Sequence, residues 1–201
     1  PATPLVAAFA STFVGLMLTG GFHEDGLADL TDGLGGSMKR EKALEIMKDS
    51  RIGSFGTLSL IIALGGKISL LTLLGQQDII LACLALFGAH ISSRFTPLFL
   101  IRFQSHVGDE AGSKSKPLSD SISWPTFSVG TIWWLASLIL LHFLYPDVPW
   151  WGAVVGTVIT LIWMFRLLVK RLGGFTGDGL GATQQICEIG FYLGLLLVMQ
   201  T

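Results

Sequence analysis

The sequence predicts an all-α integral membrane protein, a helical bundle with about six transmembrane helices. The first observation is composition, since 51% of the 201 residues are hydrophobic and only 13% are charged, whereas an ordinary soluble domain carries roughly 25% charged residues. The second is that the apolar residues fall in long blocks. The third is that connections with and without basic residues alternate along the chain.

The apolar blocks are each close to the ~20 residues that a helix needs to cross a bilayer. In chain order they are 5–22, 56–75, 79–101, 127–144, 150–169 and 180–199. Between the first two we expect a helix that starts near Asp25 and a short amphipathic stretch over 41–47. We expect residues 1–201 to form a single integral membrane domain in the lipid bilayer.

Basic residues give the topology, because short loops rich in Lys and Arg stay on the cytoplasmic side. This places loops 23–55, 102–126 and 170–179 in the cytoplasm, while the turns 76–78 and 145–149 carry no basic residue. Pro1 then lies outside, and we expect at least one further span upstream of it. The net charge of -1 argues against a nucleic-acid partner. The basic residues in or beside the three loops are Lys39, Arg40, Lys42, Lys48, Arg51, Arg102, Lys114, Lys116, Lys170 and Arg171.

An acidic motif, GFHEDGLADLTDG at residues 21–33, opens the first loop. At 100° per residue, Asp25, Asp29 and Asp32 share one face of a helix, opposite three leucines. Their axial separations of about 6 Å and about 4.5 Å allow them to converge on one or two Mg²⁺ ions and a substrate diphosphate. The glycines of the motif each cost roughly 1 kcal/mol within a helix, which indicates close approach by another group. The alternative is a solvated polar face at the membrane surface.

A basic motif, EIMKDSRIG at residues 45–53, follows the amphipathic stretch. Lys48 and Arg51 suit phosphate oxygens, Arg through its bidentate fork and Lys as a point charge. The alternative is an ordinary pair of cytoplasmic positive charges.

A glycine-rich motif, GGFTGDGLG at residues 173–181, fills the last cytoplasmic loop. Its backbone N–H groups can form an anion-binding concavity, and Asp178 stands at the start of a helix. A flexible turn capped by the Asp is the alternative. Two glycine-rich acidic segments on one membrane face indicate one shared site.

Charged residues inside the apolar blocks are candidates for function, because a central Lys costs about 2.5–3.5 kcal/mol on insertion scales. Lys67 lies near the middle of the second block and Arg94 toward the cytoplasmic end of the third. Glu188, in the last block, is expected to be hydrogen-bonded inside the bundle.

These motifs together resemble the cobalamin synthase family, the adenosylcobinamide-GDP ribazoletransferases. The similarity is dense from residue 19 to 67 and returns at 170–182. It implies a prokaryotic plasma (inner) membrane protein with its active site on the cytoplasmic side. It also agrees with a missing N-terminal span. Glu24 stands where several family members carry an apolar residue, so it is given less weight than its neighbours.

The resemblance implies a Mg²⁺-dependent phosphoryl transfer. A ribose hydroxyl of α-ribazole, or of its 5'-phosphate, attacks the cobinamide-bearing phosphate of adenosylcobinamide-GDP and releases GMP. Such chemistry needs groups that hold metal and neutralise charge. The metal ligands would be Asp25, Asp29, Asp32 and Asp178, where Asp178 is a further ligand or binds the second substrate. The catalytic residues would be Lys48, Arg51 and a general base, either His23 or Asp49. The substrate-binding residues would be Lys67, Arg94, Thr176 and Gly177.

Two other classes of protein stay open. A phosphatidyl- or prenyltransferase-like enzyme would also hold Mg²⁺ and a diphosphate with spaced aspartates. An ion-coupled transporter would explain Lys67, Arg94 and Glu188. Other enzymes of cobalamin assembly are further candidate partners, with loop 102–126 as a docking site.

Overall fold

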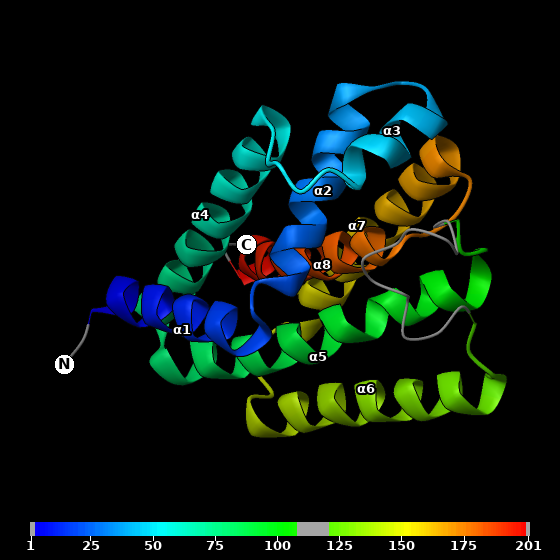
Figure 1. Cartoon of the computed structure of the whole chain (residues 1–201). Helices are drawn as coiled ribbons and strands as arrows, with labels where there is room; N and C mark the ends of the chain where they lie inside the picture. Colours follow the sequence, from blue (N-terminus) through cyan, green and yellow to red (C-terminus); the bar gives the residue numbers. More distant parts are fainter. Residues whose placement is uncertain (1–2, 108–120, 200–201) are drawn as a thin grey trace.

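The computed structural model describes residues 3–107 and 121–199, and over these ranges the chain forms a bundle of eight helices (Figure 1). The all-α prediction is confirmed, since 84% of the structure is helical and its described residues form no strand. The predicted loop 102–126 lies partly outside the described residues, and with it Lys114 and Lys116.

Five helices are long and apolar enough to cross a membrane, and each contains one of the predicted blocks. Each extends beyond its block by up to a few residues at one or both ends. These helices are α4 (Ser54–Gln77), α5 (Ile79–Phe103), α6 (Trp124–Leu144), α7 (Trp150–Leu172) and α8 (Gly177–Met199).

The first predicted span is broken. Helix α1 (Pro4–Thr19) ends before the predicted boundary, and α2 (Phe22–Gly36) leaves at an angle of 88°. Gly20 and Gly21 both have positive φ, 65° and 69°, a conformation that glycine adopts without strain. The prediction of one continuous helix over 5–22 is therefore wrong, and six spans are reached only if the bent pair counts as one.

The segment between α2 and α4 carries a short helix, α3 (Arg40–Met47), as the sequence predicted. It packs against α2 through Ala43 and Met47, both buried. A Cβ atom on Gly33 would lie 2.8 Å from the carbonyl oxygen of Ala43, so glycine is needed for this approach.

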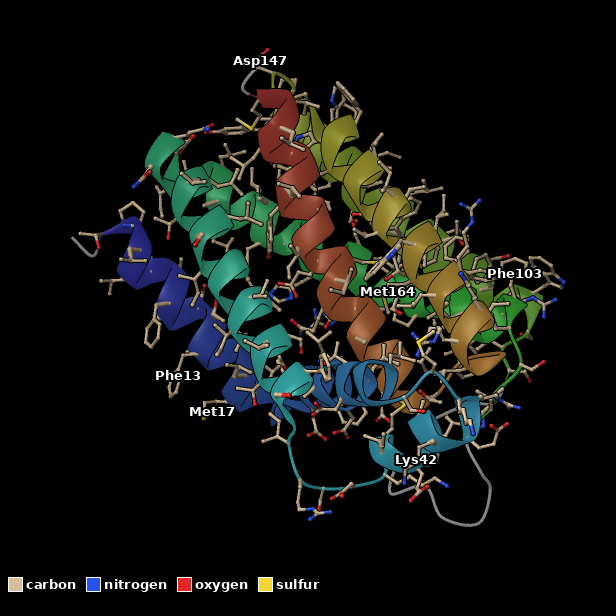
Figure 2. All side chains as sticks on the ribbon, turned by 90° about the horizontal axis from the view of Figure 1, so that it is seen from above. Phe13, Met17, Lys42, Phe103, Asp147 and Met164 are labelled. Carbon is tan, nitrogen blue, oxygen red and sulfur yellow. The ribbon has the colours of Figure 1, made fainter. Side chains whose placement is uncertain are left out.

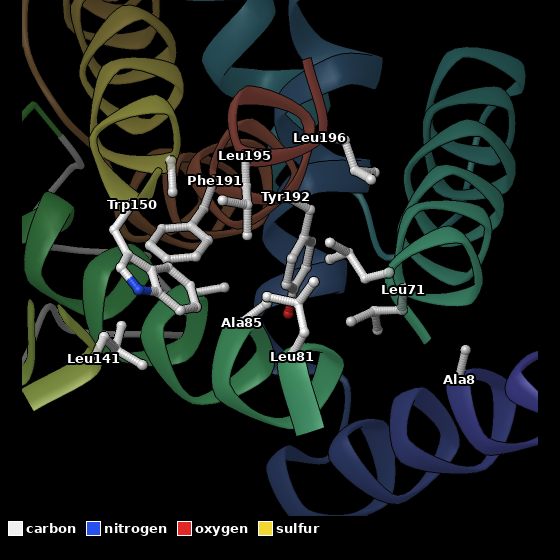
Figure 3. Close-up of a cluster of buried hydrophobic side chains, with 13 residues drawn as sticks. Ala8, Leu71, Leu81, Ala85, Leu141, Trp150, Phe191, Tyr192, Leu195 and Leu196 are labelled. Atoms are coloured by element: carbon white, nitrogen blue, oxygen red, sulfur yellow. The ribbon is translucent and has the colours of Figure 1, made fainter. Parts of the chain in front are cut away.

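Helix α8 is the central element and packs against α2, α4, α5 and α7. Figure 3 shows one apolar cluster around its C-terminal half, where Phe191, Tyr192 and Leu195 meet side chains of α4, α5 and α7. A second cluster lies around its N-terminal half and includes Leu27 and Leu30 of α2.

The two ends of the bundle agree with the alternation of loops. Figure 2 places Lys42 and Asp147 at opposite ends of the molecule. At one end the Tyr145 hydroxyl donates a hydrogen bond to Asp78, which joins the two turns without basic residues. At the other end Arg171 Nη2 donates to the carbonyl oxygens of Leu34 and Ser37, at 2.9 and 2.7 Å. The predicted loops 23–55 and 170–179 therefore lie together.

Candidate active site

The acidic and glycine-rich motifs meet where α2 crosses the start of α8. A Cβ atom on Gly26 would lie 2.9 Å from the carbonyl oxygen of Asp178, and one on Gly181 would lie 3.2 Å from that of His23. A larger side chain at Gly26 would push the helices apart, whereas one at Gly181 would require a shift of a few tenths of an ångström. The two motifs therefore lie against each other, as a shared site would require, and that they form one site stays a prediction.

Asp25 and Asp178 are the two carboxylates at this crossing. Asp25 is exposed and Asp178 is half-buried, and their negative charges act on each other. Within residues 3–107 and 121–199 neither carboxylate receives a hydrogen bond or an ion pair. Like charges held together without compensation favour the binding of a cation.

Asp32 is used differently from the other predicted metal ligands. Its side chain is buried, and its oxygens accept the backbone N–H groups of Gly53, at 2.6 Å, and Gly56, at 2.8 Å. These bonds satisfy backbone donors at the start of α4 that have no partner within the helix. The predicted triad is therefore corrected, because Asp32 holds α4 against α2. Asp29, which is half-buried, remains a candidate ligand together with Asp25.

The glycine-rich motif forms a turn that is capped by Thr176, and not by Asp178 as the alternative interpretation expected. The cap is Thr176, whose Oγ1 accepts the N–H of Gly179 at 3.0 Å, and Gly177 is the first residue of α8. Both predicted substrate-binding residues thus have structural roles. Because Thr176 provides the cap, the carboxylate of Asp178 is not used for it.

The basic motif lies beside the C-terminal half of α2. Asp49 and Arg51 form an ion pair of 2.6 Å and line a cavity of about 380 Å³ together with Asp32. Lys48, at the end of α3, lines a separate hollow of about 370 Å³. The basic motif therefore contacts α2 through Asp32, whose carboxylate accepts the N–H of Gly53 at the end of the motif.

Lys67 is buried in the bundle and has a partner there. Its Nζ lies 2.6 Å from Glu188 Oε1, and the two side chains are 7% and 1% exposed. A lysine neutralised in this way does not present its charge to a phosphate, so we no longer assign Lys67 to the substrate. The expectation that Glu188 is bonded inside the bundle is confirmed.

Arg94 and His23 remain near the crossing. The guanidinium of Arg94 is exposed, and its Nη1 lies 2.7 Å from His90 Nδ1 on the same helix. Its charge acts on the half-buried ring of His23. Arg94 and His23 therefore lie in one electrostatic environment.

Sequence reasoning missed a hydrogen-bonded chain that runs along α8. Gln185 Nε2 donates to Glu24 and Gln184 at 2.9 Å, Gln184 Nε2 donates to Glu188 Oε2 at 3.1 Å, and the Tyr192 hydroxyl donates to Glu188 Oε1 at 3.0 Å. The signal was in the sequence. Gln184, Glu188 and Tyr192 are spaced four residues apart, so they share one face of a helix.

The carboxylates of this site suit Mg²⁺ only if a substrate supplies further oxygen ligands. The described residues hold no group of three or more His, Cys, Asp or Glu side chains arranged to bind a metal. Mg²⁺ is, however, commonly bound through one or two carboxylates, with substrate phosphates and waters as its other ligands. The pair Asp25 and Asp178 meets that requirement.

Comparison with known proteins gives one consistent result. The family model for cobalamin-5-phosphate synthase matches residues 1–196. A protein of Polaromonas sp. is 51% identical over 97% of this chain and 74% of its own length, and one of Albidiferax ferrireducens is 50% identical over 96% and 74%. A Vibrio cholerae protein is 43% identical over 97% and 72%. All three are named adenosylcobinamide-GDP ribazoletransferase. No solved structure matches the chain.

Proposed function

The chain belongs to the cobalamin-5-phosphate synthase family, and we propose that it joins α-ribazole, or its 5'-phosphate, to adenosylcobinamide-GDP with release of GMP. A ribose hydroxyl oxygen forms a bond to the phosphorus that carries the cobinamide. The bond from that phosphorus to the oxygen of GMP breaks, and GMP leaves with the electron pair. The hydroxyl proton passes to a base, and adenosylcobalamin or its 5'-phosphate is formed.

The observation that carries this proposal is the crossing of α2 and α8. It brings Asp25 and Asp178, which are 153 residues apart in the chain, into one electrostatic environment. A diphosphate substrate carries several negative charges, and two adjacent carboxylates would repel it. The two carboxylates therefore favour a reaction in which a cation lies between protein and phosphate.

Mg²⁺ is the cation that we propose for this site, held by Asp25 and Asp178, with Asp29 as a further candidate. When bound it would neutralise charge on the diphosphate. The other groups belong to the chain itself. His23, in the first turn of α2, is the candidate base for the hydroxyl proton, with Asp49 as the alternative.

The cationic side chains would orient the diphosphate and stabilise the departing GMP. The charge of Arg94 acts on His23, whereas Lys48 and Arg51 line cavities beside α2 and α3. Arg51 is largely exposed, and its ion pair with Asp49 is a surface pair that a phosphate can replace.

We further propose that the enzyme is a multi-pass protein of the prokaryotic inner membrane with this site on the cytoplasmic side. The support is that Lys39, Arg40 and Lys42 lie on the α3 end of the bundle, together with Lys170 and Arg171. Basic residues of short loops are retained in the cytoplasm.

The test is the release of nucleotide by the purified protein in detergent. Adenosylcobinamide-GDP, α-ribazole and Mg²⁺ together should give GMP and a cobalamin product, and omission of α-ribazole or Mg²⁺ should abolish both. Formation of CMP or pyrophosphate from another diphosphate would instead favour a phosphatidyl- or prenyltransferase-like enzyme. An ion-coupled transporter would release no nucleotide without a membrane gradient.

A further inference from the structure

An apolar cavity of about 410 Å³ lies against α2, on the side of its leucines. Its walls come from four helices. Leu27, Leu30 and Leu34 belong to α2, and the others include Ile62 of α4 and Trp163 and Leu167 of α7. The cavity thus touches the helix that carries the candidate ligands, on its apolar face.

The few polar groups in this cavity are already bonded within the protein. Thr31 Oγ1 lies 2.8 Å from Ser59 Oγ and 2.8 Å from the carbonyl oxygen of Leu27. Arg171 Nη2 donates to two backbone carbonyl oxygens at one end of the cavity. Water would find few partners in such a space, so the cavity suits an apolar occupant.

The cavity opens sideways between two membrane helices. Both α4 and α7 pack on α8, but they do not pack extensively on each other (Figure 2). Ile62 and Trp163 at the opening are 72% and 54% exposed. On a membrane-spanning helix an exposed apolar side chain faces lipid, so hydrocarbon chains of the bilayer have direct access.

Positive charge lies at one end of the opening. Arg171 lines the cavity, and Lys170 in the last turn of α7 is exposed. Lys170 follows Trp163 by seven residues, which places the two within about 20° on the same side of the helix. Cationic residues near the cytoplasmic membrane surface attract anionic lipids by about 1 kcal/mol each.

We propose that this groove is a binding site for an anionic glycerophospholipid. One acyl chain fills the apolar cavity between α4 and α7 and packs on the leucines of α2, while the phosphate lies at Lys170 and Arg171. The lipid would thereby support α2 from the side opposite Asp25. The proposal does not depend on the reaction catalysed, because binding is measured directly.

Native mass spectrometry of the full chain, purified in mild detergent and mixed with phosphatidylglycerol or phosphatidylethanolamine, tests the proposal. We expect one retained phosphatidylglycerol per chain and weaker retention of phosphatidylethanolamine. Equal retention of both lipids would contradict the preference for an anionic lipid, and no retention of either would overturn the site.

A matched pair of variants locates the acyl chain. Ile62→Trp places a larger side chain at the cavity and should reduce retention about tenfold, whereas Ile61→Trp adds the same group to an exposed neighbour that does not line the cavity. If both variants retain as much lipid as the unmodified protein, the acyl chain does not lie in this groove.

A second pair tests the headgroup. Lys170→Gln should lower the retention of phosphatidylglycerol about fivefold and leave that of phosphatidylethanolamine unchanged. Lys39→Gln, in the exposed residues before α3, should change neither. An equal effect of the two substitutions would show that only net charge matters and would contradict a site at α7.

Discussion

Two regions of this bundle hold charged side chains in opposite arrangements, one without a counter-charge among the described residues and one as a neutralised pair. At the crossing of α2 and α8, Asp25 and Asp178 act on each other, and within the described ranges no cation compensates them. In the middle of the bundle, Lys67 and Glu188 neutralise each other, and Tyr192 and Gln184 saturate the carboxylate. A charged residue in a membrane span can thus be neutralised within the protein instead of facing a substrate.

The position of the buried pair explains its role. Along α4, Lys67 lies between Ala63 of one apolar cluster and Leu71 of the other, and Glu188 separates the same clusters along α8. Polar contacts that must be satisfied fix the register of packed helices more strictly than interchangeable apolar ones. The buried region therefore positions helices, whereas the crossing is available for a ligand.

The largest expected effect comes from the crossing. Asp25→Asn and Asp178→Asn should each lower kcat/KM for GMP release by at least about 100-fold, because several kcal/mol of charge stabilisation are lost with the cation. The thermal stability should not fall, since each substitution relieves repulsion between carboxylates. Asp147→Asn, an exposed acid at the opposite end of the bundle, is the control and should retain full activity.

The same two substitutions should be coupled. The double variant should be little worse than either single variant, because both remove one shared function. Effects on kcat/KM that add to within about 0.5 kcal/mol would mean that Asp25 and Asp178 act independently.

The next effect is on stability and comes from the buried pair. Lys67→Met or Glu188→Leu alone should lower the free energy of unfolding by about 3–5 kcal/mol, because a buried charge is left without its partner. The double variant should recover much of this loss. Thermal unfolding in detergent, followed by circular dichroism, measures the change.

Nucleotide release by the double variant decides the role of Lys67. We expect the Mg²⁺ dependence of the unmodified protein. A double variant as stable as the unmodified protein but unable to release GMP would return Lys67 to the substrate site.

A smaller effect distinguishes Asp32 from the other aspartates. Asp32→Ala removes the acceptor for two backbone N–H groups at the start of α4 and should cost about 2 kcal/mol of unfolding free energy. Activity per folded molecule should fall much less than in Asp25→Asn. A loss of activity as large as that of Asp25→Asn, with unchanged thermal unfolding, would restore Asp32 to the metal site.

Much of the fold could be predicted from the sequence because hydrophobic blocks and loop charges are local signals. The five long helices and α3 follow from them directly. The break at Gly20 and Gly21 could not be predicted in this way, since two glycines within an apolar block are compatible with either a helix or a turn. Only the packing of α2 across the start of α8 decides between the two.

The candidate site was predicted in its parts but not in its partners. Helical periodicity placed Asp25, Asp29 and Asp32 on one face, yet it could not show that Asp32 meets the backbone of Gly53 and Gly56. Likewise, hydropathy identified Lys67 as unusual without showing that Glu188 lies beside it. Pairing between helices depends on tertiary packing, which hydropathy and helical periodicity do not show.

The smallest expected effect is at the opposite end of the bundle, where Tyr145 donates a hydrogen bond to Asp78. This bond, with the backbone N–H of Ile80, lowers the pKa of Asp78, and the same bond raises the pKa of Tyr145. Stability from a lowered carboxyl pKa is present above the unfolded pKa of about 3.9 and is lost as the pH falls through the folded value. Tyr145→Phe should therefore lower the melting temperature slightly at pH 7, and the difference from the unmodified protein should shrink below about pH 4. An equal difference at pH 7 and at pH 3 would mean that the phenol contributes by packing alone, and that the charged hydrogen bond does not hold the two turns together.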